Sequence, residues 1–261
     1  MVPFSLAAKG VLCYNLCGKG GRAVEQAKGR IELLDALRGG ALLVMIAHHI
    51  CYDLCVFCGF PWVWFTNPVW NVLHYLDAGT FILLAGVSSD FSHSNLRRGA
   101  KTLLAALVIS AVTFVMDMPI LFGVLHMMGV CMLLYGLTQR FWERLRQRIP
   151  PLIPIVSVLG ILATAKLVNG YLSTVPHLWM FGLVTQDFYS SDYFPLLPWA
   201  FVFFFGTWLG KPIRERKLPR WFYTASCPPL AAIGRHSMLI YIAHQPVIYA
   251  VVMAVLFLLK R

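Results

Sequence analysis

The sequence predicts an all-α membrane protein, a polytopic helix bundle with about seven transmembrane helices and a cytoplasmic N-terminus. Hydrophobic residues make up 59% of the 261 positions and charged residues only 13%, a composition that is rare among soluble domains of this size. Several apolar runs reach the ~20 residues that a helix needs to cross a bilayer. The basic residues gather in alternate loops. These three observations together predict the fold class.

Seven apolar stretches define the expected spans. The third span is the weakest, because Pro119 and Gly123 leave little room for a turn before the fourth. The chain before the first span is basic and partly Gly-rich, so we expect a flexible cytoplasmic tail over 1–30 and a transmembrane domain over 31–261. The spans are expected at 33–57, 70–91, 100–119, 122–138, 150–172, 194–210 and 230–258.

The net charge of +11 could indicate a nucleic-acid partner, but the distribution of the charge argues against one. Lys and Arg occur before the first span and after the second, fourth and sixth, whereas 58–69 and 173–193 contain none. This alternation is the positive-inside pattern, which places the N-terminus in the cytoplasm and the C-terminus outside. We therefore expect a multi-pass protein, in a bacterial inner membrane, whose basic residues contact anionic lipid headgroups.

The first span carries three ionisable residues, Arg38, His49 and Asp53, in an otherwise apolar run. Such residues are costly at membrane depth and indicate a functional site by default. Arg38 and His49 are eleven residues apart, so they share a helix face at a separation of roughly 16 Å. Asp53 follows His49 by one turn, and a carboxylate bonded to an imidazole fixes its tautomer and raises its basicity. The pair therefore suits a general base or a nucleophile.

The predicted orientation also assigns a depth to each polar residue. Four spans bring a histidine or carboxylate to the middle-to-outer depth: His49, Asp77, His126 and His244. Arg38 and Arg235 lie instead on the cytoplasmic side. The sequence thus predicts a polar site in the outer half of the bundle, with basic groups beneath it.

Several polar or small residues have purely structural explanations. His48 and His74 are expected to hydrogen-bond neighbouring helices, and Asp90 is expected at the membrane interface. Asp35 sits in the first turn of its helix, where it can pair with Arg38. The glycines at 39, 40 and 86 are expected to permit close helix packing.

A metal site on the first span is an alternative, because three cysteines lie near the histidines. Their spacings of four and three residues, at Cys51, Cys55 and Cys58, are those of a buried helix face, and no CxxC pair is present. We expect no metal cofactor.

A series of short motifs makes the chain similar to a known family. They are LDALRG at 34–39, YDL at 52–54, GVS at 86–88, LHMMG at 125–129, DYFPLLPW at 192–199, GRHS at 234–237 and HQP at 244–246. In order and spacing they resemble the heparan-alpha-glucosaminide N-acetyltransferase catalytic domain family, and Arg38 with His49 resembles the signature of the wider membrane acyltransferase superfamily. The resemblance covers roughly residues 30–250.

The resemblance implies an acetyltransferase that moves an acetyl group from cytosolic acetyl-CoA to an amine or hydroxyl of an extracytoplasmic sugar or glycan. The chain is shorter than the lysosomal enzyme and has no large lumenal domain. A bacterial envelope sugar, amino sugar or lipid-linked glycan is therefore the expected acceptor. The lipid bilayer is an expected partner, and a second copy of the chain is a further candidate.

The site residues divide into three groups. The catalytic group is His49, Asp53, His126 and His244. The acceptor-binding group is Asp77, Asp192, Tyr193, Trp199 and Gln245. The group that binds acetyl-CoA is Arg38, Arg235, His236 and Ser237.

The chain departs from the lysosomal enzyme at the residue proposed there as the active histidine. Asn67 occupies that place here, ahead of the matching Trp70-Asn71 pair, so the role moves to His49 by the superfamily pattern. In the expected mechanism His49 removes the proton of the acceptor as the acceptor attacks the thioester carbonyl. Asp53 orients His49, and His126, His244 or Gln245 donates a hydrogen bond to the developing oxyanion. A route through an acetylated His49 stays open.

Two other classes of function use the same buried polar residues. A small-anion transporter or a ligand-binding bundle would need the charges without any chemistry. A haem-b electron carrier would need paired histidines on facing helices, for which His49 and His244 are candidates.

Overall fold

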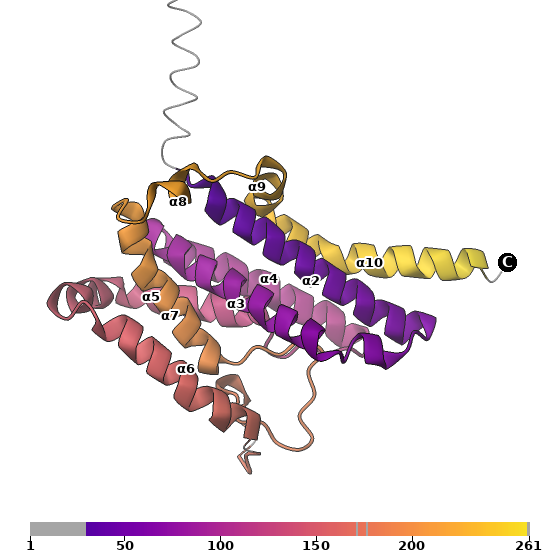
Figure 1. Cartoon of the computed structure of the whole chain (residues 1–261). Helices are drawn as coiled ribbons and strands as arrows, with labels where there is room; N and C mark the ends of the chain where they lie inside the picture. Colours follow the sequence, from indigo (N-terminus) through magenta and orange to yellow (C-terminus); the bar gives the residue numbers. More distant parts are fainter. Residues whose placement is uncertain (1–29, 171, 176, 260–261) are drawn as a thin grey trace, which may run out of the picture.

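The computed structural model describes residues 30–170, 172–175 and 177–259, so the predicted tail lies outside the described residues except for Arg30. The described part is helical, with one isolated bridge between Phe122 and Tyr193, which confirms the all-α prediction (Figure 1). Its elements are α2 (Glu32–Cys58), η1 (Trp62–Trp64), α3 (Pro68–Phe91), α4 (Asn95–Val115), α5 (Val124–Arg148), α6 (Leu152–Gly170), η2 (Trp179–Phe181), α7 (Leu196–Arg214), α8 (Arg220–Thr224), α9 (Pro228–Arg235) and α10 (Ser237–Leu259).

Five of these helices are long and apolar enough to cross a membrane, namely α2, α3, α4, α7 and α10. The helices α5 and α6 pass only as a pair, which is bent by 107° at a short break. The second half of α5 carries four arginines, between 140 and 148. Because of these charges, α5 is not apolar over a length sufficient to cross the membrane by itself. The described residues thus give five or six spans, and the predicted count of seven is not confirmed.

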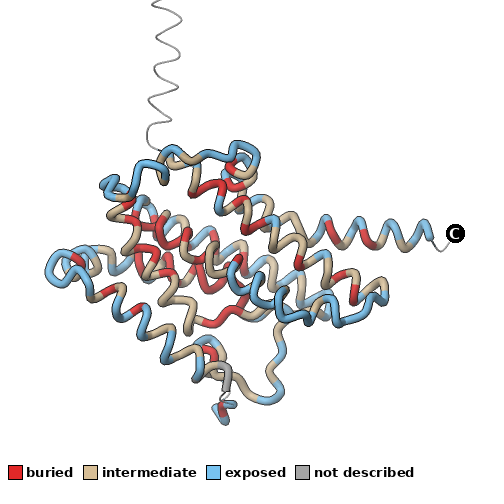
Figure 2. The backbone as a smooth tube through the Cα atoms, viewed as in Figure 1, coloured by how far each residue is buried: buried red, intermediate tan, exposed pale blue. Residues whose placement is uncertain are grey.

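The bundle is organised around the contacts of α3 and α2. The helix α3 packs on α7, while α2 packs on α3, α9 and α10; α4 packs on α5, and α6 packs on α7 (Figure 1). Buried residues concentrate where α3, α5 and α7 meet, among them Ile82, Tyr135 and Phe203 (Figure 2). The outward faces of the long helices expose large apolar side chains, as expected for helices in contact with lipid.

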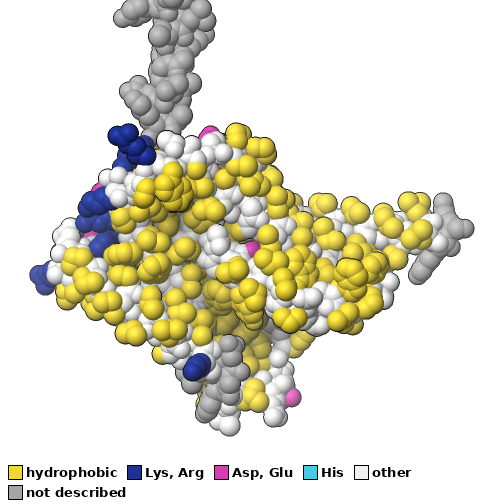
Figure 3. Space-filling model, in the orientation of Figure 1, with side chains coloured by type: hydrophobic (Ala, Val, Ile, Leu, Met, Phe, Trp, Pro, Cys, Tyr) yellow, Lys and Arg dark blue, Asp and Glu magenta, His cyan; other side chains and the backbone are white. Residues whose placement is uncertain are grey.

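The space-filling view agrees with the predicted asymmetry of charge. Most of the visible face is apolar, and Lys and Arg side chains gather along the edge formed by α8 and the C-terminal end of α7 (Figure 3). This edge carries the basic stretch 211–220. It lies on the side that the positive-inside pattern assigns to the cytoplasm.

Two close helix contacts depend on glycine. A Cβ atom on Gly86 of α3 would collide with the backbone of Phe203 in α7. In the same way α2 and α9 meet at Gly39 and Gly234, each against the other helix's backbone. The packing role expected for Gly39 and Gly86 is confirmed, whereas Gly40 borders open space.

A buried ion-pair network joins α3, α5 and α7 near their C-terminal ends. The Asp90 carboxylate is paired with Arg146 of α5 at 2.9 Å and with Arg214 of α7 at 3.1 Å. The Tyr135 hydroxyl donates to the same carboxylate at 3.2 Å. Only 5% of Asp90 is exposed, because two cations balance its charge inside the protein. The interfacial depth expected for Asp90 stays a prediction.

Candidate active site

The helices α2 and α10 bring His49 and His244 into contact, with ring centroids 4.8 Å apart and the rings edge to face. In each ring the Nδ1 atom faces a backbone carbonyl of its own helix, that of Met45 at 2.9 Å and that of Tyr241 at 2.5 Å. A carbonyl oxygen can only accept a hydrogen bond, so each Nδ1 carries the proton. In the neutral ring this leaves Nε2 as the basic nitrogen of His49.

Asp53 has a different partner from the one that the spacing predicts. Its fully buried carboxylate accepts hydrogen bonds from the Gln245 side-chain nitrogen at 3.1 and 3.2 Å. Helical side chains point back toward the N-terminus, so His49 reaches the carbonyl of Met45 rather than the carboxylate one turn ahead. Asp53 therefore fixes α10 on α2 and holds His244, the neighbour of Gln245, beside His49.

A small cavity of about 40 Å³ lies beside His49. Three of its polar lining residues, Asp77, Asp192 and Tyr241, come from α3, from the segment before α7 and from α10. The other lining residues are Ala41, Leu42, Met45, His74, Ala78, Phe81, Val124 and Phe194. The volume has room for about one water molecule. The structure thus brings His49, Asp77 and Asp192 to one space. Of the other two residues assigned to this depth, His244 contacts His49, whereas His126 does not line the cavity.

Asp192 lies outside the membrane-spanning segments, in the connection that precedes α7. Its Oδ2 atom accepts a hydrogen bond of 3.4 Å from the backbone amide of Val124, in the first turn of α5. Burial raises the pKa of the Asp192 carboxyl, although the nearby His49 and this amide both act in the opposite direction.

Three other predicted residues do not line the cavity themselves. The Nε2 atom of His126 lies 3.3 Å from the Ser110 hydroxyl of α4. The Tyr193 hydroxyl donates to the Trp179 carbonyl at 2.5 Å. The ring of Trp199 packs on Phe194, so it supports the cavity wall from behind.

The residues predicted to bind acetyl-CoA differ in their surroundings: Arg38 is bonded to other side chains, whereas Arg235 and His236 are exposed. Arg38 pairs with Asp35 at 2.9 Å, as predicted, and also bonds the Ser88 hydroxyl and the Leu84 carbonyl of α3. Arg235 and His236 are exposed at the junction of α9 and α10, directly before Ser237. Arg38 therefore joins two helices, whereas Arg235 and His236 lie on the surface.

A family model described as "Heparan-alpha-glucosaminide N-acetyltransferase, catalytic" matches residues 30–246. The chain belongs to this family. The matched region contains each predicted site residue, from Arg38 to Gln245. Comparisons with curated proteins and with solved structures gave no significant match. Family membership and the apolar helices together indicate an integral membrane acetyltransferase.

In this heparan-alpha-glucosaminide N-acetyltransferase family member, His48 and His74 do not have the role predicted for them: among the described residues, neither ring hydrogen-bonds a neighbouring helix. His48 and His74 stack at 4.2 Å with their planes 11° apart. His74 also lines the cavity and places its Nδ1 atom 3.8 Å from the Asp77 carboxylate. The spacing of His74 and Asp77, three residues on one helix, was the signal in the sequence that could have identified His74.

The same geometry bears on the metal and haem alternatives. Among residues 30–170, 172–175 and 177–259, no group of three His, Cys, Asp or Glu side chains is placed to hold a metal ion. Two axial haem ligands need the macrocycle between them. The direct contact of the His49 and His244 rings leaves no such space.

Proposed function

We propose that this chain transfers the acetyl group of acetyl-CoA to an amine or hydroxyl of an extracytoplasmic sugar or glycan, in a bacterial inner membrane. The observation that supports it most is that His49, whose basic nitrogen is Nε2, lines one cavity together with the carboxylate residues Asp77 and Asp192. An imidazole of this kind suits proton removal, and carboxylates suit the recognition of sugar hydroxyls.

In the proposed mechanism, Nε2 of His49 takes a proton from the acceptor amine or hydroxyl as that atom attacks the thioester carbonyl. The tetrahedral intermediate then collapses, the carbon–sulfur bond breaks, and the CoA thiolate receives the proton from His49. Asp77 and Asp192 accept hydrogen bonds from the acceptor. The route through an acetylated His49 uses the same nitrogen as a nucleophile.

The oxyanion donor that we propose is the hydroxyl of Tyr241, which lines the cavity. The other candidates are already engaged: Nδ1 of His244 bonds a carbonyl, the Gln245 nitrogen bonds Asp53, and His126 contacts Ser110. A well-placed donor contributes on the order of 3 kcal/mol to the stabilisation of such an intermediate.

The CoA phosphates would bind at the exposed junction of α9 and α10, where Arg235, His236 and Ser237 follow one another. Cationic side chains bind phosphate through charge-assisted hydrogen bonds. Arg38, bonded to Asp35 and α3, would hold the helices between which the pantetheine arm reaches His49.

A transfer assay tests this proposal. The full chain in detergent, given acetyl-CoA with a radiolabelled acetyl group and a panel of amino sugars and glycans, should form labelled product and one equivalent of free CoA. A transporter would instead move solute across proteoliposomes without consuming thioester. Intact acetyl-CoA with every acceptor, together with solute movement, would contradict the proposal.

Asp192→Asn should change the pH dependence of acceptor binding. The carboxyl of Asp192 is neutral below its pKa, and because burial raises that pKa, acceptor binding should begin to weaken at a higher pH than for an ordinary aspartate. In the wild type the KM for glucosamine should therefore rise as the pH falls. In Asp192→Asn the KM should be high and lose this acid-side dependence, because the carboxylate is absent.

The matched control is Asp187→Asn, an exposed aspartate of the same connection, which should keep the wild-type profile. A wild-type KM and pH profile in Asp192→Asn would exclude Asp192 from acceptor binding.

A further inference from the structure

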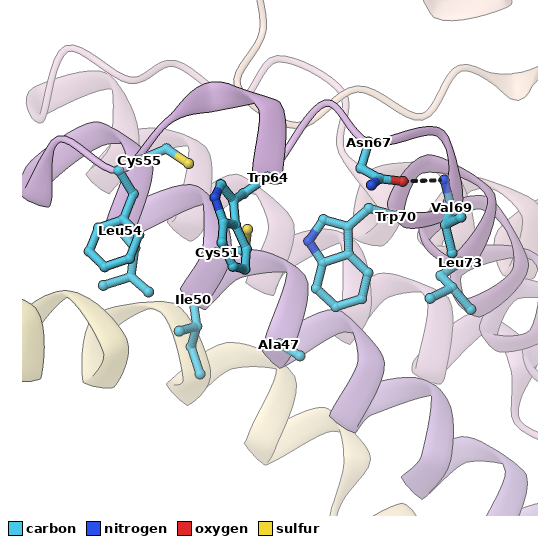
Figure 4. Close-up of a pocket in the computed structure, with 11 residues that line it drawn as sticks. Ala47, Ile50, Cys51, Leu54, Cys55, Trp64, Asn67, Val69, Trp70 and Leu73 are labelled. Carbon is cyan, nitrogen blue, oxygen red and sulfur yellow. Dashed lines mark hydrogen bonds between the residues drawn. The ribbon is translucent and has the colours of Figure 1, made fainter.

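A large open groove lies at the C-terminal end of α2, beside η1 and the first turns of α3. Its volume is about 550 Å³, within the range of small-molecule sites and far above the 40 Å³ of the cavity at His49. Figure 4 shows its lining side chains, which come from α2, η1, α3 and the short connections between them. They are Ala47, Ile50, Cys51, Leu54, Cys55, Phe60, Trp64, Asn67, Val69, Trp70 and Leu73.

The chemistry of the groove is that of a hydrocarbon site. Asn67 is its single amide, and the side-chain oxygen of Asn67 already accepts the Val69 amide at 2.9 Å in capping α3 (Figure 4). The remaining lining side chains are apolar, and no charged residue is among them. Burial of a hydrocarbon chain on such a surface is favourable at about 0.8 kcal/mol per CH₂ group relative to water.

The position of the groove gives it access to lipid. It lies at the ends of α2 and α3 that the positive-inside pattern assigns to the outer leaflet. Val69 and Trp64 at its edge are 66% and 65% exposed, and indole rings favour the membrane–water interface. An alkyl chain can therefore enter the groove sideways from the outer leaflet.

A chain of ring contacts links the groove to the cavity, from the groove-lining Trp70 through His48 to the cavity-lining His74. Ala47 and Leu73 face the groove, while their chain neighbours in α2 and α3 include the stacked pair His48 and His74. The His48 ring lies 6.1 Å from the groove-lining Trp70 and 5.9 Å from His49. A headgroup attached to an alkyl chain in the groove would thus lie beside the rings of His48 and His74, which are adjacent to His49.

We infer that this groove holds the alkyl chain of the acceptor, so that the acceptor is an amine or hydroxyl carried on a lipid anchor. The inference rests on the proposed function and names the substrate class of the same site. The anchor would position the sugar at His49 from within the outer leaflet.

The test compares glucosamine with dodecyl glucosaminide as acceptors for the full chain in nanodiscs. Wild-type kcat/KM should be at least tenfold higher for the dodecyl compound. Ala47→Phe, which fills the groove, should reduce this preference by about tenfold. Leu43→Phe, one turn earlier on a lipid-facing position of α2, should keep it. Partitioning of the dodecyl chain into the bilayer is common to all three proteins, so the comparison of variants isolates the groove.

A second readout does not depend on turnover. Dodecyl glucosaminide with a terminal diazirine should label residues between 47 and 73 in the wild type, and Ala47→Phe should remove this label. Labelling that unmodified dodecyl glucosaminide does not compete away would show a site for bulk bilayer lipid and overturn the inference.

Failure of the lipid-anchored acceptor can be distinguished from failure of the proposed function. Acetylation of glucosamine with no difference between Ala47→Phe and Leu43→Phe would retain the proposed function and overturn the lipid-anchored acceptor. Absence of acetylation with both acceptors would overturn the proposed function, and the labelling would still decide whether the groove binds the alkyl chain.

Discussion

Replacing His49 by alanine should lower kcat/KM for acetyl transfer by about 10²–10⁴-fold, the range that a positioned general base contributes. The Nδ1 proton of His49 is committed to the Met45 carbonyl, so the variant loses Nε2, the basic nitrogen that we propose accepts the proton of the acceptor. The loss should appear with saturating acetyl-CoA and a fixed acceptor, while size-exclusion profile and thermal stability stay close to the wild type.

The control for this variant is His93→Ala, which removes an exposed histidine and should leave turnover unchanged. Added imidazole should restore part of the activity of His49→Ala, because a free base can occupy the vacated space. Full turnover in His49→Ala would remove His49 from the mechanism. A quenched wild-type reaction that contains acetyl-histidine at position 49 would instead establish the two-step route.

The helical bundle and the proximity of His49, Asp77 and His244 could be predicted from the sequence, because both follow from local patterns. Apolar runs of sufficient length specify the helices, and the alternation of basic loops brings His49, Asp77 and His244 to a common depth. The span count was not confirmed, because the arginines in the second half of α5 fall within a continuous helix rather than in a loop. A helix can continue beyond its apolar part, so the end of an apolar run in the sequence does not mark the end of the helix.

The partners of individual side chains were less predictable, because several are distant in sequence. Asp53 and Gln245 are 192 residues apart, so the local spacing favoured the nearer His49. Asp90 lies near the end of its helix, which favours a position at the membrane interface. Its partner Arg146 is 56 residues away and could not be predicted from local spacing. Such pairs form only when the helices pack, and a single sequence contains no signal for them.

The same distant pairing predicts the largest effect on stability. Arg146→Met should reduce the free energy of unfolding by about 3 kcal/mol or more, because breaking a buried ion pair leaves a charge without compensation. Asp90 would keep the Tyr135 hydroxyl and one paired cation, Arg214, whose side chain is 53% exposed and screened by water. Thermal unfolding in detergent measures the change, and Arg148→Met, an exposed arginine two residues along α5, should have little effect.

The double variant Asp90→Asn with Arg146→Met separates charge from packing. An asparagine needs no cation, so the double variant should be more stable than Arg146→Met alone, although both lack the guanidinium between α3, α5 and α7. A buried ion pair is often worth little relative to a neutral replacement of similar volume, and the double variant should therefore recover part of the loss. Equal stability of the single and double variants would show that Arg146 acts through packing, and that the charge of Asp90 is already balanced by Arg214.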